Sequence, residues 1–220
     1  SITEADLSIA ANYQKASEYL DIDSYIDYQV IEMYVVNEDW PGGNVNCWHS
    51  RSDNSKWRYV LYDTDFGFGI WDADKVNHNM LTWCTNAVDE NPNAYKANDP
   101  FGTLMFRSLL QNDDFKRDFM NHTADRLNTT LSPDSIIHVV DSVESLIASE
   151  IPFHTTKWSA YTYLADMKSC INDIRVFARN RESVMRTQTE EFFATNGSYT
   201  LSLALSDNNA GKIHLNSIDV

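Results

Sequence analysis

The sequence is poor in basic residues, and this scarcity limits the partners that the protein can bind through charge. Lys and Arg number 17 against 32 Asp and Glu in 220 residues, so the formal net charge is −15 at pH 7. Nucleic acids and anionic membrane surfaces attract proteins through clustered cations. We therefore expect no nucleic-acid partner and no binding to an anionic membrane surface.

Long apolar runs and paired cysteines are also missing. No run of about 18 apolar residues occurs, so no membrane-spanning helix is predicted. The three cysteines, Cys47, Cys84 and Cys170, are widely spaced without a C-x-x-C pair. Neither a disulfide framework nor a zinc knuckle is indicated. We interpret the cysteines as small buried apolar residues.

Motifs for histidine metal sites and for acyl transfer are absent as well. The six histidines form no H-E-x-x-H motif, which argues against a histidine metal site. Ser-x-Gly and Cys/His pairings suited to acyl transfer are not found, so no hydrolase triad is expected. One predicted helix carries a run of basic residues at Arg175, Arg179, Arg181 and Arg186. We interpret this run as a solvated or salt-bridged face in preference to a phosphate-binding patch.

The residues that are present fit one folded domain with a short appendage. Hydrophobic residues make up 43% and charged residues 22% of the chain, which is ordinary for a folded soluble protein. The length allows one sizeable core but not two full domains. We predict a mostly α-helical domain of class α+β over residues 1–195 and a β-hairpin segment over residues 196–220.

Apolar periodicity near 3.6 residues predicts several helices. The first covers residues 21–36, with Asp23 or Ser24 as its N-cap. Three others follow capping residues or prolines, at residues 104–110, 115–127 and 136–147. A last long helix is predicted at about 165–193, with Gly197 as its stop. Pro41, Gly42 and Gly43 exclude both helix and strand from the intervening loop, residues 37–44. Residues 66–98 show little periodicity and are expected to form a long ordered loop.

Two hairpins are predicted. Residues 45–50 and 56–65 are rich in Trp, Tyr and Val and flank a turn-like segment. Residues 199–206 and 212–218 alternate in polarity around a second turn. An isolated hairpin is marginal in water, so we expect the second one to open a further domain or to dock as an edge on the first domain.

The residues with the clearest chemical meaning lie around the first hairpin. Asp39 is followed five positions later by Asn44, then by the hairpin, and then by Asp63 and Asp65 before Phe66 and Gly67. Phosphoryl transfer from ATP requires a carboxylate near the attacking hydroxyl, with an amide oxygen and a second carboxylate on Mg²⁺. This order is typical of the catalytic and metal loops of kinases. Each motif alone fits a solvated turn, but the combination indicates phosphotransfer.

Asp63 and Asp65 are the candidate metal ligands together with Asn44. On a strand the two carboxylates point to the same face, roughly 6.5 Å apart. Both are then able to bind one metal cluster, or one binds while the other orients it. Oxygen ligands without a thiolate cluster favour Mg²⁺ or Mn²⁺ over zinc.

The sequence resembles the CotH kinases, a family of atypical protein kinases that includes spore-coat members. The resemblance rests on five segments: IDSYIDY (residues 22–28), NEDWPGGN (37–44), KWRYVLYDTDFGFG (56–69), DFKRD (114–118) and IRVFARNR (174–181). It implies a protein-kinase-like C-terminal lobe that uses ATP and Mg²⁺ or Mn²⁺ to phosphorylate protein hydroxyls. Asp39 would be the catalytic Asp, and Asn44 a metal ligand. Asp63, which keeps Phe68-Gly69 at plus five and plus six, ranks before Asp65 as the metal-loop Asp.

The chain also departs from the pattern of ordinary protein kinases. Asn37 and Glu38 precede Asp39 in place of a His-Arg pair. Only 38 residues stand before Asp39, with Lys15 as their sole lysine and no Gly-rich phosphate loop. We therefore expect a C-terminal lobe without its nucleotide-binding half, and weak or no catalysis by this chain alone. The alternative function is a non-catalytic scaffold, and in either case we expect an extracellular or cell-surface location. The oligomeric state stays open.

Overall fold

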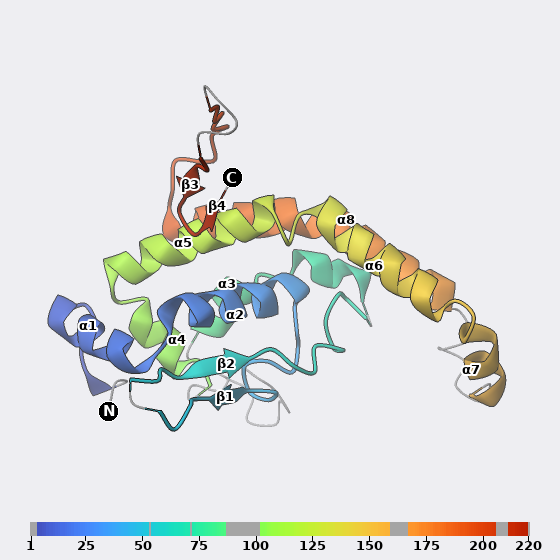
Figure 1. Ribbon diagram of the computed structural model, residues 1–220, viewed down its shortest axis with the longest axis horizontal. Helices are drawn as coiled ribbons and strands as arrows, with labels where there is room; N and C mark the ends of the chain where they lie inside the picture. Colours follow the sequence, from blue (N-terminus) through green and yellow to red (C-terminus); the bar gives the residue numbers. More distant parts are fainter. Residues whose placement is uncertain are drawn as a thin grey trace.

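The computed structural model describes residues 4–52, 54–70, 72–86, 102–158, 167–205 and 211–219. These residues form a mostly helical structure with two small antiparallel sheets of two strands each (Figure 1). The named helices are α1 (Ala10–Tyr19), α2 (Ile22–Val35), η2 (Ala73–Asn77), α3 (Met80–Thr85), α4 (Leu104–Leu109), α5 (Asp113–Asn128), α6 (Pro133–Ile147), α7 (Ile151–Lys157) and α8 (Met167–Phe193). The predicted class, α+β and mostly helical, is confirmed.

Helix α2 lies at the centre of the core. Nine of its side chains are buried: Tyr25, Ile26, Tyr28, Gln29, Val30, Glu32, Met33, Tyr34 and Val35. The helix begins after Asp21, whose carboxylate accepts a hydrogen bond from the Ser24 N–H at 3.2 Å. The predicted caps, Asp23 and Ser24, are wrong, because both already belong to the first helical turn.

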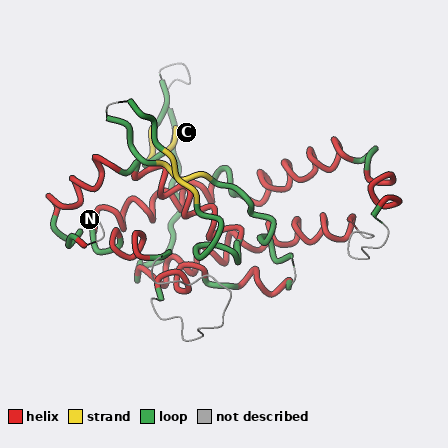
Figure 2. Tube along the Cα trace, turned by 90° about the horizontal axis from the view of Figure 1, so that it is seen from below, coloured by secondary structure: helices red, strands yellow, loops and turns green. Residues whose placement is uncertain are grey.

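Helix α8 connects the helices around α2 with helix α6. It contacts α2, α3, α5, η2 and α6. Helix α6 runs along α8, and this pair projects from the other helices toward α7 (Figure 1 and Figure 2). Arg175 of α8 forms ion pairs with Asp141 and Glu144 of α6. The salt-bridged face predicted for the basic run is therefore present at Arg175.

The long helices agree with the sequence prediction, but four short helices do not. The predicted segments 104–110, 115–127, 136–147 and 165–193 correspond to α4, α5, α6 and α8, although residues 165–166 lie outside the described residues. Helices α1 and α7 were not expected. The predicted loop at 66–98 is wrong where η2 and α3 occur, and residues 87–98 lie outside the described ranges. Helix α3 is only six residues long, so burial rather than propensity stabilises it.

The first predicted hairpin is present but shorter than expected. Strand β1 (Asn46–Trp48) pairs antiparallel with β2 (Arg58–Val60), with Cys47 opposite Tyr59. Both strands are mostly exposed. The interior location predicted for the cysteines is right for Cys84 and wrong for Cys47 and Cys170.

The C-terminal hairpin differs from its prediction. Strands β3 (His214–Leu215) and β4 (Ile218–Asp219) pair with each other, whereas residues 199–205 form no strand. Their turn docks on α5, where the buried Asp125 accepts hydrogen bonds from Asn216 Nδ2 at 3.2 Å, Ser217 N at 2.9 Å and Ser217 Oγ at 2.7 Å. The division at residues 195 and 196 stays a prediction.

Replacing Asp125 by Ala is expected to release this hairpin from α5. The carboxylate is the acceptor for all three donors of the turn, and losing a buried acceptor of this kind costs about 1 to 3 kcal/mol. Hydrogen exchange of residues 211–219 measures the release. Asp118→Ala on the same helix is the control, and equal exchange in the two variants would contradict the prediction.

Candidate functional site

Two loops meet at the C-terminal end of α2. The Asp39 loop (residues 37–44) follows the helix directly. The Asp63 loop (residues 61–69) follows β2 and returns to α2, where the Phe68 N–H donates to the Val35 carbonyl at 2.6 Å. A Cβ at Gly67 would come within 3.0 Å of that carbonyl oxygen. Glycine at this position therefore allows the close approach of the Asp63 loop.

The two loops are joined by Asn44. Its side-chain Nδ2 donates to the Asp63 carbonyl at 3.2 Å. Asn44, Asp63 and Phe68 all have left-handed backbones, with φ of 52°, 56° and 56°. Such conformations cost energy in residues other than glycine, and they concentrate at functional sites. The unusual backbone conformations therefore occur in the same two loops as the sequence motifs.

The candidate carboxylates lie close enough to influence one another. A hydrogen bond with the Asp65 side chain raises the pKa of Asp63, and the negative charges of Asp65 and Asp39 act in the same direction. Asp39 is half-buried, while Asp63 and Asp65 are exposed. The structure therefore brings Asp39, Asn44, Asp63 and Asp65 to one place.

The route by which Asp63 and Asp65 meet differs from the prediction. Strand β2 ends at Val60, and Asp63 has a left-handed backbone. The two carboxylates are thus not neighbours on one face of a strand. A turn in the Asp63 loop brings them together, and the Thr64 carbonyl accepts a hydrogen bond from Gly67 N at 3.0 Å within that turn.

The chemistry of these residues fits a hard divalent cation. In the described part of the chain, no three His, Cys, Asp or Glu side chains are arranged to hold a metal ion. The candidate set instead combines the carboxylates of Asp63 and Asp65 with the amide oxygen of Asn44, which are ligand types that Mg²⁺ accepts. After the hydrogen bond with Asp65, the negative charges of Asp65 and Asp39 add to the raised pKa of Asp63, and a bound cation would offset those charges.

A buried arginine fixes the end of α2 on which both loops rest. Arg181 of α8 is 1% exposed. Its guanidinium donates to the carbonyls of Met33 at 2.7 Å and Tyr34 at 3.0 Å in α2. It also donates to Val76 at 2.7 Å and His78 at 3.0 Å. Burial lowers the pKa of Arg181 to about 10, so the side chain stays charged at neutral pH.

The interpretation of the basic run as a surface feature is wrong for Arg181. Arg175 and Arg186 do form ion pairs near the surface, with α6 and with Glu182. Arg181 lies instead between Ala178 and Met185, three and four positions away, and both are buried. That spacing on the apolar stripe of α8 is the signal that would have identified it.

Most of the chain matches a known protein family. Residues 2–185 match the family model described as CotH kinase protein. The chain belongs to the CotH kinase family. This confirms the resemblance seen in the motifs, and the match includes both the Asp39 loop and the Asp63 loop. No curated protein and no solved structure matches the chain.

Membership of the CotH kinase family indicates a kinase-related function, and kinases in general use ATP and a divalent metal. The match ends at residue 185, inside α8. None of the helices in the described ranges is long and apolar enough to cross a membrane.

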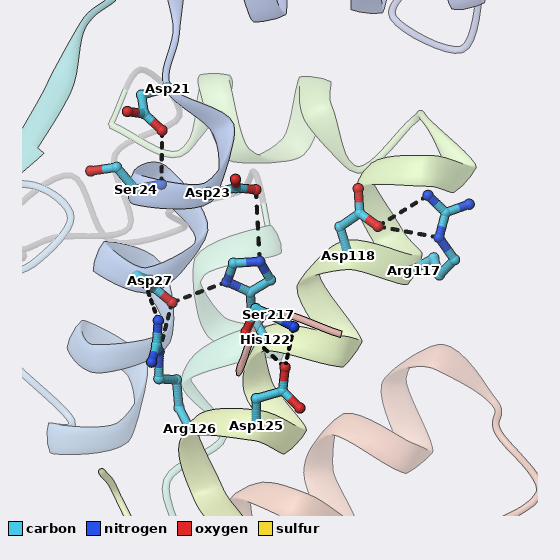
Figure 3. Close-up of polar contacts among 10 residues, drawn as sticks. All are labelled: Asp21, Asp23, Ser24, Asp27, Arg117, Asp118, His122, Asp125, Arg126 and Ser217. Atoms are coloured by element: carbon cyan, nitrogen blue, oxygen red, sulfur yellow. Dashed lines mark hydrogen bonds and ion pairs between the residues drawn. The ribbon is translucent and has the colours of Figure 1, made fainter. Parts of the chain in front are cut away.

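A second polar cluster in this CotH kinase chain links α2 to α5 (Figure 3). Asp27 of α2 accepts hydrogen bonds from Arg126 Nε at 2.9 Å and Nη2 at 2.6 Å, and it pairs with His122 Nδ1 at 3.0 Å. Asp23 lies 3.7 Å from His122 Nε2. The hydrogen bond to Asp27 raises the pKa of His122. Its partners identify His122 as a satisfied structural group between two helices.

His122→Asn is expected to destabilise this CotH kinase chain mainly at low pH. The folded-state pKa of His122 lies above its unfolded value of about 6.5. Its stabilising effect is therefore complete below about pH 6.5 and is lost as pH rises through the folded-state pKa. We expect a loss of about 1.5 to 3 kcal/mol in unfolding free energy at low pH, as for hydrogen bonds with charged partners.

Urea unfolding at about pH 5.5 and about pH 9 measures the effect, since these values bracket the titration of histidine. His138→Asn, at an exposed position of α6, is the control. A pH-independent loss in His122→Asn would contradict the assignment of charge to this imidazole.

Proposed function

We propose that this CotH kinase family member transfers the γ-phosphate of ATP to a hydroxyl group of a protein, with Mg²⁺ or Mn²⁺, on a protein-kinase-like C-terminal lobe. The observation that carries the proposal is the meeting of Asp39, Asn44, Asp63 and Asp65 at the end of α2. Phosphoryl transfer depends mainly on positioning and on charge stabilisation. The carboxylates and the amide of these residues are suited to positioning the reactants and to stabilising charge.

Each residue has a separate role in the proposal. Asp39 holds the attacking hydroxyl and takes up its proton. Asn44 uses Nδ2 to bind the Asp63 carbonyl, so its Oδ1 is the atom that serves as a metal ligand. Asp63 supplies the principal carboxylate ligand, and Asp65 adds a second carboxylate or orients the first. A divalent ion held by these residues would supply positive charge to neutralise the phosphates.

Binding of ATP tests the metal part of the proposal. We expect ATP to bind the intact protein only when Mg²⁺ is present, and Asp63→Ala to weaken that binding by at least about tenfold. Since the pKa of Asp63 is raised, the affinity should fall as pH is lowered and the carboxyl becomes protonated. Asp74→Ala, an exposed acid in η2, is the control for isothermal titration. Equal binding by both variants would contradict the assigned ligand.

Incorporation of label from γ-labelled ATP tests the transfer step. The probe acceptors are the protein itself and a peptide library that offers Ser, Thr and Tyr. Labelling that requires Mg²⁺ and disappears with a chelator supports the proposal. ATP binding without labelling of any acceptor would overturn the transfer step while leaving the metal site in place.

The exposed apolar residues after α8 favour the second candidate, a non-catalytic binding protein at the cell surface. Tyr199, Leu201, Leu203 and Leu205 alternate along a segment that is neither helix nor strand, and Tyr199 is 84% exposed. Apolar side chains exposed in this way are typical of binding surfaces. An intact protein that never binds ATP, with or without Mg²⁺, would favour this second function.

A further inference from the structure

Asn37 connects three segments that meet at the proposed site. Its side chain is fully buried. Its Nδ2 donates to Glu32 Oε2 of α2 at 2.9 Å and lies 3.5 Å from the Asp63 carbonyl oxygen, the long limit of a hydrogen bond. Its Oδ1 accepts from the backbone N–H of Asp39 at 3.2 Å. One amide therefore joins α2, the Asp39 loop and the Asp63 loop.

Glu32, the main partner of Asn37, is an unusual residue for the interior. Its side chain is fully buried, and burial raises the pKa of its carboxyl to about 7. Within the described residues, Glu32 Oε1, Tyr28 Oη and Trp40 Nε1 are buried without a hydrogen bond. Burial and the nearby Glu32 raise the pKa of Tyr28, and Trp40 lowers it, so the three side chains lie close together. The Tyr28 hydroxyl nevertheless does not reach hydrogen-bond geometry with Glu32 or Trp40.

A buried carboxyl such as that of Glu32 lowers the stability of the fold, so its presence indicates a functional role. A buried carboxyl with unpaired polar neighbours costs free energy that an apolar residue of similar size would not. Residues that break packing rules in this way occur mainly at functional sites. Here the carboxyl accepts a hydrogen bond from Asn37, whose side chain in turn bonds to the Asp39 backbone.

We propose that Glu32 and Asn37 are positioning residues, which set the place of the catalytic Asp39 relative to the Asp63 loop. This rests on the proposed phosphotransfer function. Neither residue contacts the proposed ligand atoms. Their effect is to fix the backbone at Asp39 and, through the longer contact, at Asp63. A displacement of about 1 Å at a catalytic group lowers turnover by about 100-fold.

Reversing the polarity of the pair tests the proposal. In the intact protein, Asn37→Asp places a carboxylate against Glu32 and should lower kcat by about 100-fold, while KM for ATP changes by less than about threefold. Glu32→Gln keeps an oxygen for Asn37 and should cost only a few-fold. The double variant E32Q/N37D restores one donor and one acceptor with exchanged places, so its kcat should exceed that of Asn37→Asp by at least about tenfold.

Gln29→Met is the matched control, because Gln29 is a buried polar residue of α2 that lies outside the bonds described for the two loops. It should keep wild-type kcat per folded molecule. If Asn37→Asp does not fold, Asn37→Ala gives the same comparison. Absence of rescue in E32Q/N37D, or full activity per folded molecule in Asn37→Ala, would overturn the positioning role.

Hydrogen exchange gives a reading that does not depend on catalysis. The Asp39 N–H donates to Asn37 Oδ1, so Asn37→Ala should speed its exchange by at least about tenfold, whereas Gln29→Met should not. An unchanged rate overturns the proposed contact. If the wild-type protein transfers no phosphate but the exchange rate responds, the proposed function fails and the positioning of the loop stands.

Discussion

Replacing Asp39 by Asn is expected to lower phosphate transfer by about 10²- to 10⁴-fold, the range for loss of a general base. The substitution keeps the size of the side chain but removes the group that takes up the hydroxyl proton. The backbone of Asp39 keeps its bonds, since the carbonyl accepts from Gly43 N at 2.7 Å and the N–H donates to Asn37. Initial rates with γ-labelled ATP measure the effect.

The loss in Asp39→Asn should fall on kcat rather than on ATP binding, because Asp39 is not among the proposed metal ligands. Asp74→Asn provides a change of the same chemistry at an exposed position of η2. A rate for Asp39→Asn within about threefold of the Asp74→Asn rate would refute the role of Asp39 as base.

Replacing Arg181 by Met should cause a large loss of stability, about 3 to 5 kcal/mol. Methionine fills a similar volume, so the loss does not come from an empty cavity. It comes from four carbonyls, at Met33, Tyr34, Val76 and His78, which lose their shared donor. Lysine at this position should recover only part of the loss, because its donors are not arranged in a planar fork.

Denaturant unfolding of Arg181→Met measures this loss, with Arg179→Met as the control. Arg179 lies on the same helix but is exposed, and surface substitutions usually change stability by less than about 0.5 kcal/mol. Similar midpoints for the two variants would show that the buried hydrogen bonds of Arg181 do not support the end of α2.

The sequence was sufficient for the long helices because they carry both periodicity and end signals. Helix α6 illustrates this, since Ser132 caps it and Pro133 occupies its first turn. Helix α1 has no side-chain N-cap hydrogen bond and only one buried residue, Ala16. Its last residue, Tyr19, accepts a hydrogen bond from the distant Trp57 N–H at 2.7 Å, and a local pattern does not contain that information.

The grouping of the candidate site residues follows from the order of the motifs, but their geometry does not. The prediction placed Asp63 and Asp65 on a strand, whereas the left-handed backbone at Asp63 turns the chain away from β2. In the sequence, Asn37 stands out only as a departure from a His-Arg pair. Its partner Glu32 lies within the buried face of α2, where a periodic pattern alone predicts an apolar residue.

Helix α8 continues past residue 185, the last position of the family match, to Phe193. In this final part, Gln188 Nε2 donates to the Asn77 carbonyl at 2.8 Å, and the Phe193 ring lies 6.0 Å from that of Phe119 between centroids. A chain cut at residue 185 would lose Phe193 and expose the buried Phe119 side chain to water, which would favour aggregation. Expression boundaries for this protein should follow the helix rather than the limits of the sequence match.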